Sequence, residues 1–127
     1  WLAGSRSADE LADALMPVLY GERFFADQPG LASAERRRLS SLDPADVAPV
    51  ARAAAATGDR LDRLAAVAAP LVVVAGESDA LVTPARLDAI AAHAAAGVVR
   101  LPWTGHSAVL ERPAEVAAAI GDFLRDR

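Results

Sequence analysis

Residues 71–74 form an unbroken apolar run, Leu-Val-Val-Val, which follows Pro70 and ends at Ala75 and Gly76. A run of this kind is typical of a strand buried on both faces of a parallel sheet. Such a strand needs a neighbouring strand on each edge and packed elements above and below it. This requirement constrains the fold more than any other feature of the sequence.

The segment after this run predicts a strand–helix–strand–helix unit over residues 70–125. A helix begins at Thr83 and Pro84 and is expected to close at Gly97, and residues 98–101 have the pattern of a second short strand. The order predicts an α/β fold with a parallel sheet and a right-handed crossover. Offsets of three and four positions predict the buried residues of the last helix, which are Val116, Ala119, Ile120, Phe123 and Leu124.

Residues 1–66 contain helical patterns and no convincing strand pattern. Ser7 and Glu10 have the spacing of a capping box that begins a first helix. Pro17 is expected to kink or end that helix near its middle. The remaining predicted elements are a loop with aromatic anchors over residues 21–30 and helices over residues 33–42 and 43–58.

A strand that is buried on both faces needs a strand on each side, and two strands alone cannot provide this. We therefore expect further strands from another part of the protein. The sequence opens on Trp1 rather than Met, in the middle of ordinary domain sequence. We therefore expect the missing strands to lie upstream of Trp1. Residues 1–66 form the first predicted unit, and residues 67–127 form the βαβα part of a larger core.

The composition argues against several classes of partner. A net charge of −4 and a pI near 5.1 do not suit nucleic acid, and the basic run at residues 36–38 is expected to be a solvated helix face. The absence of cysteine excludes disulfides and thiolate metal sites, and the two histidines make no metal centre. No stretch is long and apolar enough to span a membrane, and no export signal is visible, so a cytoplasmic protein is expected.

Two residues with catalytic chemistry follow the two predicted strands. Asp79 comes just after the first strand and His106 just after the second, and they are 27 positions apart. Because parallel strands bring their carboxyl ends to one edge, the two side chains are expected to meet there. A carboxylate in that position would hold the imidazole in one tautomer and leave its other nitrogen for a nucleophile.

Residues 70–84 resemble the acid-bearing segment of α/β-hydrolases, and residues 101–106 and 110–116 resemble their histidine loop and final helix. The resemblance covers residues 60–125, while residues 1–59 match loosely as a helical cap. It implies the carboxy-terminal portion of the α/β-hydrolase fold, with Asp79 as triad acid and His106 as general base. The family order is nucleophile, acid, histidine. The nucleophile and the oxyanion loop are therefore expected upstream, in the missing amino-terminal half of the fold.

Other interpretations of these residues remain. Asp79 and His106 could each be ordinary loop residues. Ser78 lies in a stretch, residues 76–80, that nearly fits the G-x-S-x-G elbow, but the helix there is delayed until Pro84. His93, inside an alanine-rich helix, is expected at the surface.

The resemblance implies a hydrolase that acts on an ester, lactone or similar small carbonyl substrate without a cofactor. Trp103, Phe24 and Phe25 are candidates for the walls of its substrate pocket. The alternatives are an enzyme of the same fold with an aspartate nucleophile, such as an epoxide hydrolase or dehalogenase, a haloperoxidase-like enzyme, or a non-catalytic binding protein. A nucleotide-binding domain lacks support because no glycine-rich phosphate loop follows a strand. The 127 residues alone are expected to be inactive.

Overall fold

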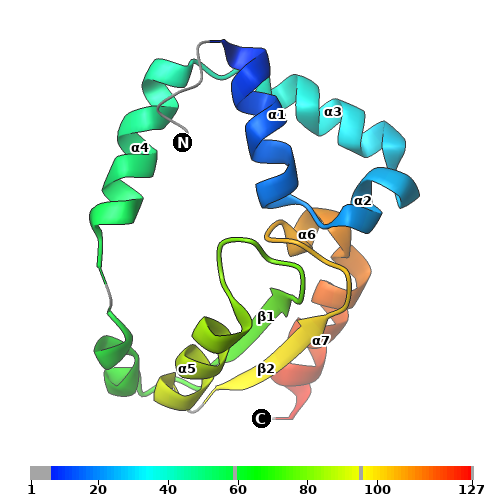
Figure 1. Ribbon diagram of the computed structural model, residues 1–127. Coiled ribbons are helices and arrows are strands. Elements are labelled where there is room, and N and C mark those ends of the chain that lie inside the picture. The colour runs from blue at the N-terminus through cyan, green and yellow to red at the C-terminus, as the bar shows by residue number, and fades with distance from the viewer. Residues whose placement is uncertain (1–6, 59, 95, 127) are drawn as a thin grey trace.

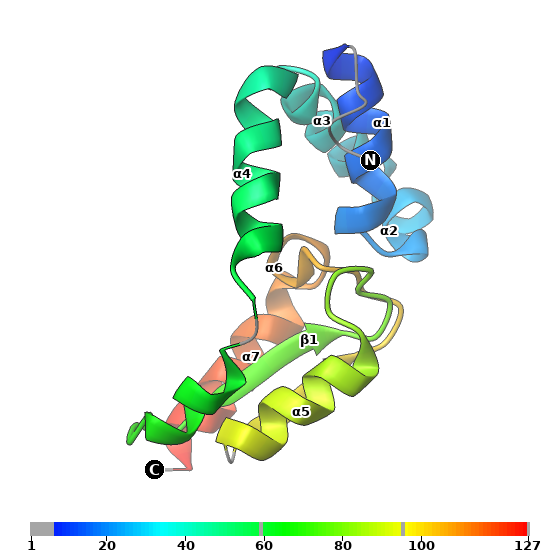
Figure 2. The same ribbon diagram turned by 60° about the vertical axis from the view of Figure 1, so that its left-hand side comes forward.

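Two parallel strands, β1 (Val72–Gly76) and β2 (Gly97–Leu101), form the sheet of the computed structural model, which describes residues 7–58, 60–94 and 96–126 (Figure 1). Their register places Val72 beside Gly97 and Gly76 beside Leu101. Helix α5 (Pro84–Ala94) joins the strands, and α6 (Ala108–Glu111) and α7 (Pro113–Arg125) follow β2. Figures 1 and 2 show α5 and α7 on opposite faces of the sheet. The predicted strand–helix–strand–helix order is confirmed.

Two details of this part differ from the prediction. Gly97 does not close α5 but begins β2, because its amide donates to the carbonyl of Leu71 at the start of the sheet. In α7, Val116 and Ala119 are buried, but Ile120 is 46% and Leu124 63% exposed. Only the side of α7 that faces β1 and β2 is covered. The apolar stripe of this helix is thus wider than the surface that packs on it.

The amino-terminal half of the chain is helical, as predicted. The N-cap contact at Ser7 is present, since its hydroxyl accepts from the Glu10 amide at 3.2 Å. Its elements are α1 (Ala8–Leu19), α2 (Glu22–Asp27), α3 (Pro29–Leu39), α4 (Pro44–Ala56) and the short 3-10 helix η2 (Leu61–Ala66). Residues 1–6 of this predicted unit lie outside the described residues.

Three predictions about these helices were wrong. Pro17 does not end α1 near its middle, because it lies in the last turn of a helix that continues to Leu19. Residues 21–30 do not form a loop, since α2 occupies residues 22–27. A helix of only six residues is not stable by itself, and the burial of Phe24 in the core stabilises it. Pro29 then starts α3 four residues before the predicted boundary at Ser33, because proline suits the first helical position.

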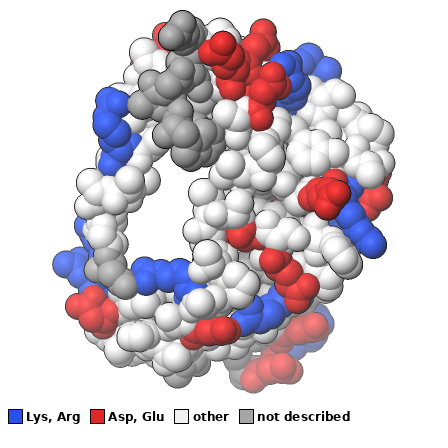
Figure 3. Space-filling view, in the orientation of Figure 1, with Lys and Arg blue, Asp and Glu red and all other residues white. Residues whose placement is uncertain are grey.

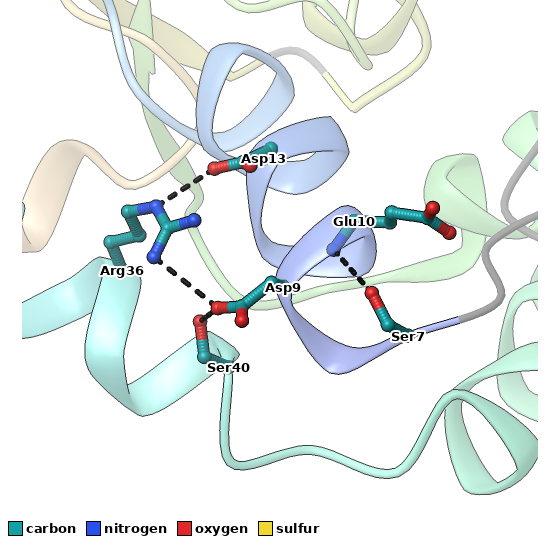
Figure 4. A network of polar contacts seen from close by, with 6 residues as sticks. All are labelled: Ser7, Asp9, Glu10, Asp13, Arg36 and Ser40. Atoms are coloured by element: carbon teal, nitrogen blue, oxygen red, sulfur yellow. Dashed lines mark hydrogen bonds and ion pairs between the residues drawn. The ribbon is translucent and has the colours of Figure 1, made fainter.

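Helices α1, α2 and α3 pack around one hydrophobic core. Its buried residues are Ala12, Met16, Tyr20, Phe24, Ala32 and Leu39. Figure 4 shows the polar contacts at the edge of this core: Arg36 on α3 pairs with Asp13 at 2.8 Å and Asp9 at 3.4 Å on α1. The Ser40 hydroxyl also donates to Asp9, at 2.9 Å. These side chains are exposed, so they orient α3 on α1 while the apolar contacts hold the pair together.

A second core lies between the sheet and the carboxy-terminal helices. It consists of Leu101, Ala108 and Val116, with Val74 and Val99 packed against it. Helix α4 belongs to neither core: none of its residues is buried, and Val50 is 68% exposed. Figure 3 shows an open gap between α4 and the rest of the molecule on this face. In the described part of the chain, no helix has the length and apolarity needed to cross a membrane.

Two glycines provide a matched test of the packing at the sheet. A Cβ on Gly76 would lie 2.1 Å from the Thr104 carbonyl oxygen, whereas a Cβ on Gly30 in α3 would meet nothing within 4 Å. Gly76→Ala is expected to destabilise the protein by about 3 kcal/mol or more, because backbone atoms must move apart. Gly30→Ala is expected to stabilise it by about 0.5–1 kcal/mol, because alanine loses less entropy in a helix. Denaturant unfolding measures both, and equal effects would contradict this packing.

Candidate active site

The loops that follow β1 and β2 lie side by side at the carboxyl edge of the sheet. We call residues 77–83 the acid loop and residues 102–107 the histidine loop. The Glu77 amide donates to the Leu101 carbonyl at 3.0 Å, and the Ser78 amide donates to the Thr104 carbonyl at 2.9 Å. These bonds extend the pairing of the strands beyond their ends. These backbone contacts hold the acid loop and the histidine loop in a fixed relation.

Asp79 in the acid loop is hydrogen-bonded at both of its carboxylate oxygens. Oδ1 accepts from the amides of Leu81 at 2.7 Å and Val82 at 3.0 Å. Oδ2 lies 2.9 Å from Nδ1 of His106. The Asp79 side chain is only 6% exposed, while that of His106 is 41% exposed. The structure thus brings the two predicted site residues together, with the carboxylate buried and the imidazole open to solvent.

The environment of Asp79 favours its ionised form. Burial alone would raise the pKa of this carboxyl, but the hydrogen bond from His106 and those from the Leu81 and Val82 amides outweigh it, so the pKa lies below the usual aspartate value. An ionised carboxylate can only accept hydrogen bonds, so Nδ1 of His106 must carry the proton of this contact. Nε2 of the neutral ring is then left with a free lone pair. In this state His106, oriented by Asp79, can accept a proton at Nε2, as a general base does.

The three aromatic candidates for the substrate pocket do not gather around this pair. Phe24 is 2% exposed and stacks on Tyr20 with ring centroids 4.4 Å apart, so it is a core residue. Phe25 lines a hollow of about 340 Å³ between α1 and α3, whose lining includes neither Asp79 nor His106. Trp103 is 54% exposed in the histidine loop, and the Arg23 guanidinium lies 4.5 Å from its ring centroid. Of the three, only Trp103 shares a loop with His106.

Trp103 also has an unusual backbone. Its φ of 60° lies in the left-handed region, which no other non-glycine residue of the described chain adopts. A bulky residue is strained in that region, so the surrounding structure must enforce the turn. The turn directs the chain from β2 toward Thr104, whose side chain is fully buried. The strain is thus located between the end of the strand and His106.

Other residues considered from the sequence take no part in the pair. Ser78 is exposed, and α5 begins only at Pro84, as the sequence predicts, so residues 76–80 have no helix directly behind them. His93 is exposed on α5, and its Nδ1 contacts the Ala89 carbonyl at 2.8 Å. Among the described residues, no group of three or more histidine, cysteine or carboxylate side chains could hold a metal ion.

Sequence reasoning missed Glu111, which is only 5% exposed although it is charged. Its carboxylate accepts from the Gly105 amide at 2.9 Å and from the Gly21 amide at 3.1 Å. The sequence carried one signal, because a glycine directly before a candidate catalytic histidine indicates a close backbone approach. Nothing in the sequence identified Gly21, 84 positions earlier, as the segment that approaches.

The two parallel strands with helices on both faces have an α/β arrangement, and comparison with known structures agrees. The structure is similar to a thermophilic esterase from Thermogutta terrifontis, solved with malate bound, with a TM-score of 0.79 and 31% sequence identity over 91% of this chain and 43% of that one. It is also similar to an N-acyl homoserine lactone degrading enzyme, with a TM-score of 0.68 and 27% identity over 91% of this chain and 47% of that one. No family model and no curated protein sequence matches the chain.

These similarities confirm the predicted family resemblance. The chain has the carboxy-terminal part of the α/β-hydrolase fold, in the form found in esterases. It spans less than half of the length of the solved structures it matches.

The lowered pKa of Asp79 leads to a prediction about acid conditions. Because the folded-state pKa lies below the unfolded value of about 3.9, the stabilisation from this carboxylate is complete above about pH 5 and is lost as the pH falls through the lowered pKa. We expect the Asp79 carboxyl carbon to titrate below pH 3.9 in an NMR experiment. The stability advantage of the native protein over Asp79→Asn should shrink progressively as the pH falls below about 5. A midpoint above the usual aspartate value would contradict the geometry.

Proposed function

We propose that the chain is the carboxy-terminal part of a hydrolase that cleaves an ester or lactone, with Asp79 as triad acid and His106 as general base. The observation that carries the proposal is the 2.9 Å hydrogen bond between His106 Nδ1 and the buried Asp79 carboxylate. The two similar structures support the substrate class, since one is an esterase and the other degrades a lactone. An ester and a lactone both contain an acyl–oxygen bond.

The chemistry follows from the state of the pair. Nε2 of His106 takes the proton of a serine hydroxyl as its oxygen attacks the substrate carbonyl, and the imidazolium is stabilised by Asp79. His106 then gives that proton to the leaving alkoxide, which departs as an alcohol and leaves an acyl-enzyme. The same nitrogen then takes a proton from a water molecule whose oxygen attacks the acyl-enzyme carbonyl, and returns that proton to the serine oxygen as the acyl–serine bond breaks and the acid is released. Asp79 stays ionised throughout, which its lowered pKa favours.

The serine, the oxyanion donors and the remaining strands are proposed to come from sequence outside these 127 residues. Among the described residues, no hydroxyl or carboxylate is hydrogen-bonded to Nε2 of His106. The matched structures are more than twice as long as the part that the chain spans. The exposed Ile120 and Leu124 on α7 give the missing strands and helices an apolar surface to cover.

Helices α1–α4 are proposed to form a cap over the site. They precede the acid strand, and α1 contacts the histidine loop through the Ser107 amide, which donates to the Leu19 carbonyl at 2.8 Å. Helix α4, which buries no residue, would face the substrate or the remaining core across the gap of Figure 3. Trp103 is proposed as the aromatic residue at the edge of the substrate pocket, because it is exposed three positions before His106.

Two histidines make a matched experiment in the full-length protein that carries this chain. His106→Ala is expected to lower kcat for p-nitrophenyl esters and N-acyl homoserine lactones by a factor on the order of 10³–10⁴ or more, because the general base is lost. Asp79→Asn should have a similar effect, because it favours the wrong tautomer of the ring. His93→Ala, on the exposed face of α5, is expected to leave kcat unchanged.

The isolated 127-residue chain is expected to show no hydrolysis of these substrates. Full activity of His106→Ala would refute the proposed role of the pair. Activity of the isolated chain that disappears in His106→Ala would instead refute the external nucleophile and keep the role of the histidine.

A further inference from the structure

Glu111 places a charge in a position where charged residues are rarely found. It is the last residue of α6 and is 5% exposed, between the helices of the first core and the histidine loop. Each carboxylate oxygen accepts from one backbone amide: Oε1 from Gly105 at 2.9 Å and Oε2 from Gly21 at 3.1 Å. Burial, and to a lesser extent the Asp79 carboxylate, raises the pKa of this carboxyl above its usual value, although the two amides and Arg112 oppose the shift. The two directed hydrogen bonds offset part of the cost of burying the carboxylate.

The two amides belong to different parts of the chain, one in the histidine loop and one at the start of α2. Gly105 directly precedes His106, and Gly21 is the N-cap of α2 at the junction with α1. On the other side of His106, the Ser107 amide donates to the Leu19 carbonyl at 2.8 Å. The histidine is therefore flanked by two residues that are both bound near the α1–α2 junction. One contact is direct, and the other passes through Glu111.

The junction and the histidine loop meet backbone to backbone. A Cβ on Gly21 would lie 2.3 Å from the Trp103 carbonyl oxygen, and a Cβ on Gly105 would lie 2.4 Å from the Gly21 nitrogen. No side chain fits between the two segments at this point. The Glu111 carboxylate accepts the hydrogen bonds of the Gly21 and Gly105 amides at this contact.

Glu111 is also held on its own backbone. The side-chain amide of Gln28, at the C-cap of α2, donates to the Glu111 carbonyl at 2.9 Å. Both ends of α2 therefore bind the same residue, the N-terminal end through Gly21 and the C-terminal end through Gln28. This arrangement fixes where the carboxylate points.

We propose that Glu111 is a positioning residue, which sets the ring of His106 against Asp79 by binding the amide next to the histidine and the α1–α2 junction with one carboxylate. The inference rests on the proposed function, because it assigns Glu111 to the same site. It explains how a ring that is 41% exposed keeps one orientation. Positioning of this kind matters because a misplacement of about 1 Å can cost a factor on the order of 10² in rate.

Glu111→Gln is the most direct test, since it keeps the size of the side chain. The NH₂ group of glutamine cannot accept, so one of the two backbone amides loses its partner and faces another donor. We expect kcat of the full-length protein to fall by about 10- to 100-fold with KM changed by less than about threefold, because ground-state binding is untouched. Glu115→Gln is the matched control, because Glu115 is an exposed neighbour on α7 that pairs with Arg112 at 3.3 Å. It should keep native kinetics.

The second readout is the ring of His106 itself, in ¹⁵N-histidine NMR spectra. The native protein is expected to show a protected Nδ1–H proton shifted downfield by the Asp79 carboxylate, assigned by its absence in His106→Ala. Glu111→Gln should broaden or abolish this signal and leave His93 unchanged. Glu115→Gln should preserve it. Circular dichroism and thermal unfolding establish that each variant is folded.

The outcomes separate this inference from the proposed function. A folded Glu111→Gln protein with a native His106 signal and native kcat overturns the positioning role. If the native protein hydrolyses no acyl ester but the His106 signal is lost in Glu111→Gln, the proposed function fails and the positioning of the ring stands. Should Glu111→Gln fail to fold, Glu111→Asp is measured instead, because it keeps the charge but is too short to reach both amides. If neither variant folds, Glu111 supports the fold as a whole and the inference is overturned.

Discussion

The contact between Gly21 and Gly105 is the constraint on which the rest of the structure depends. At this point two segments far apart in the sequence touch through their backbones, with no room for a Cβ on either side. On one side lies the core of α1, α2 and α3, and on the other lies the core of the sheet and the carboxy-terminal helices. The two cores share no buried residue. They are joined by backbone hydrogen bonds, the buried Glu111 carboxylate, the Gln28 side-chain amide and the contact of Arg23 with Trp103. Hydrogen bonds of this kind are specific in direction, whereas apolar contacts are not.

The carboxylate–histidine pair also depends on a close backbone approach at a glycine. Close approach of Gly76 to the Thr104 carbonyl lets the two strand-end loops run side by side, and the Ser78 amide then reaches the same carbonyl. Asp79 is fixed by the amides of its own loop, so the position of the carboxylate does not depend on the histidine. The histidine loop is fixed from the opposite direction, by the helices. The site is therefore supported from two directions, by the acid loop beside it and by the helices on its other side.

The sequence predicted the features that local patterns determine. The apolar run at residues 71–74 specified the first strand, and the spacing between Asp79 and His106 placed both side chains at one edge of the sheet. The errors came from tertiary contacts. Helix α2 forms because Phe24 stacks on Tyr20, and α7 leaves Leu124 exposed because nothing in the described chain packs there. Periodicity shows which residues are apolar but not which neighbours cover them.

Glu111 is a second example of a feature that local sequence patterns do not predict. A glutamate near a helix start is ordinary in sequence, and its burial depends on a backbone 90 positions away. The junction of α1 and α2 contacts the histidine loop through backbone atoms. The contact therefore depends little on which side chains the helices carry. Helical segments could therefore be exchanged among related proteins, with different pocket linings, so long as the incoming segment presents a glycine at this turn. Gly21, Gly105 and Glu111 would then act as a joint at which the helical segment changes while the loops at the strand ends stay the same.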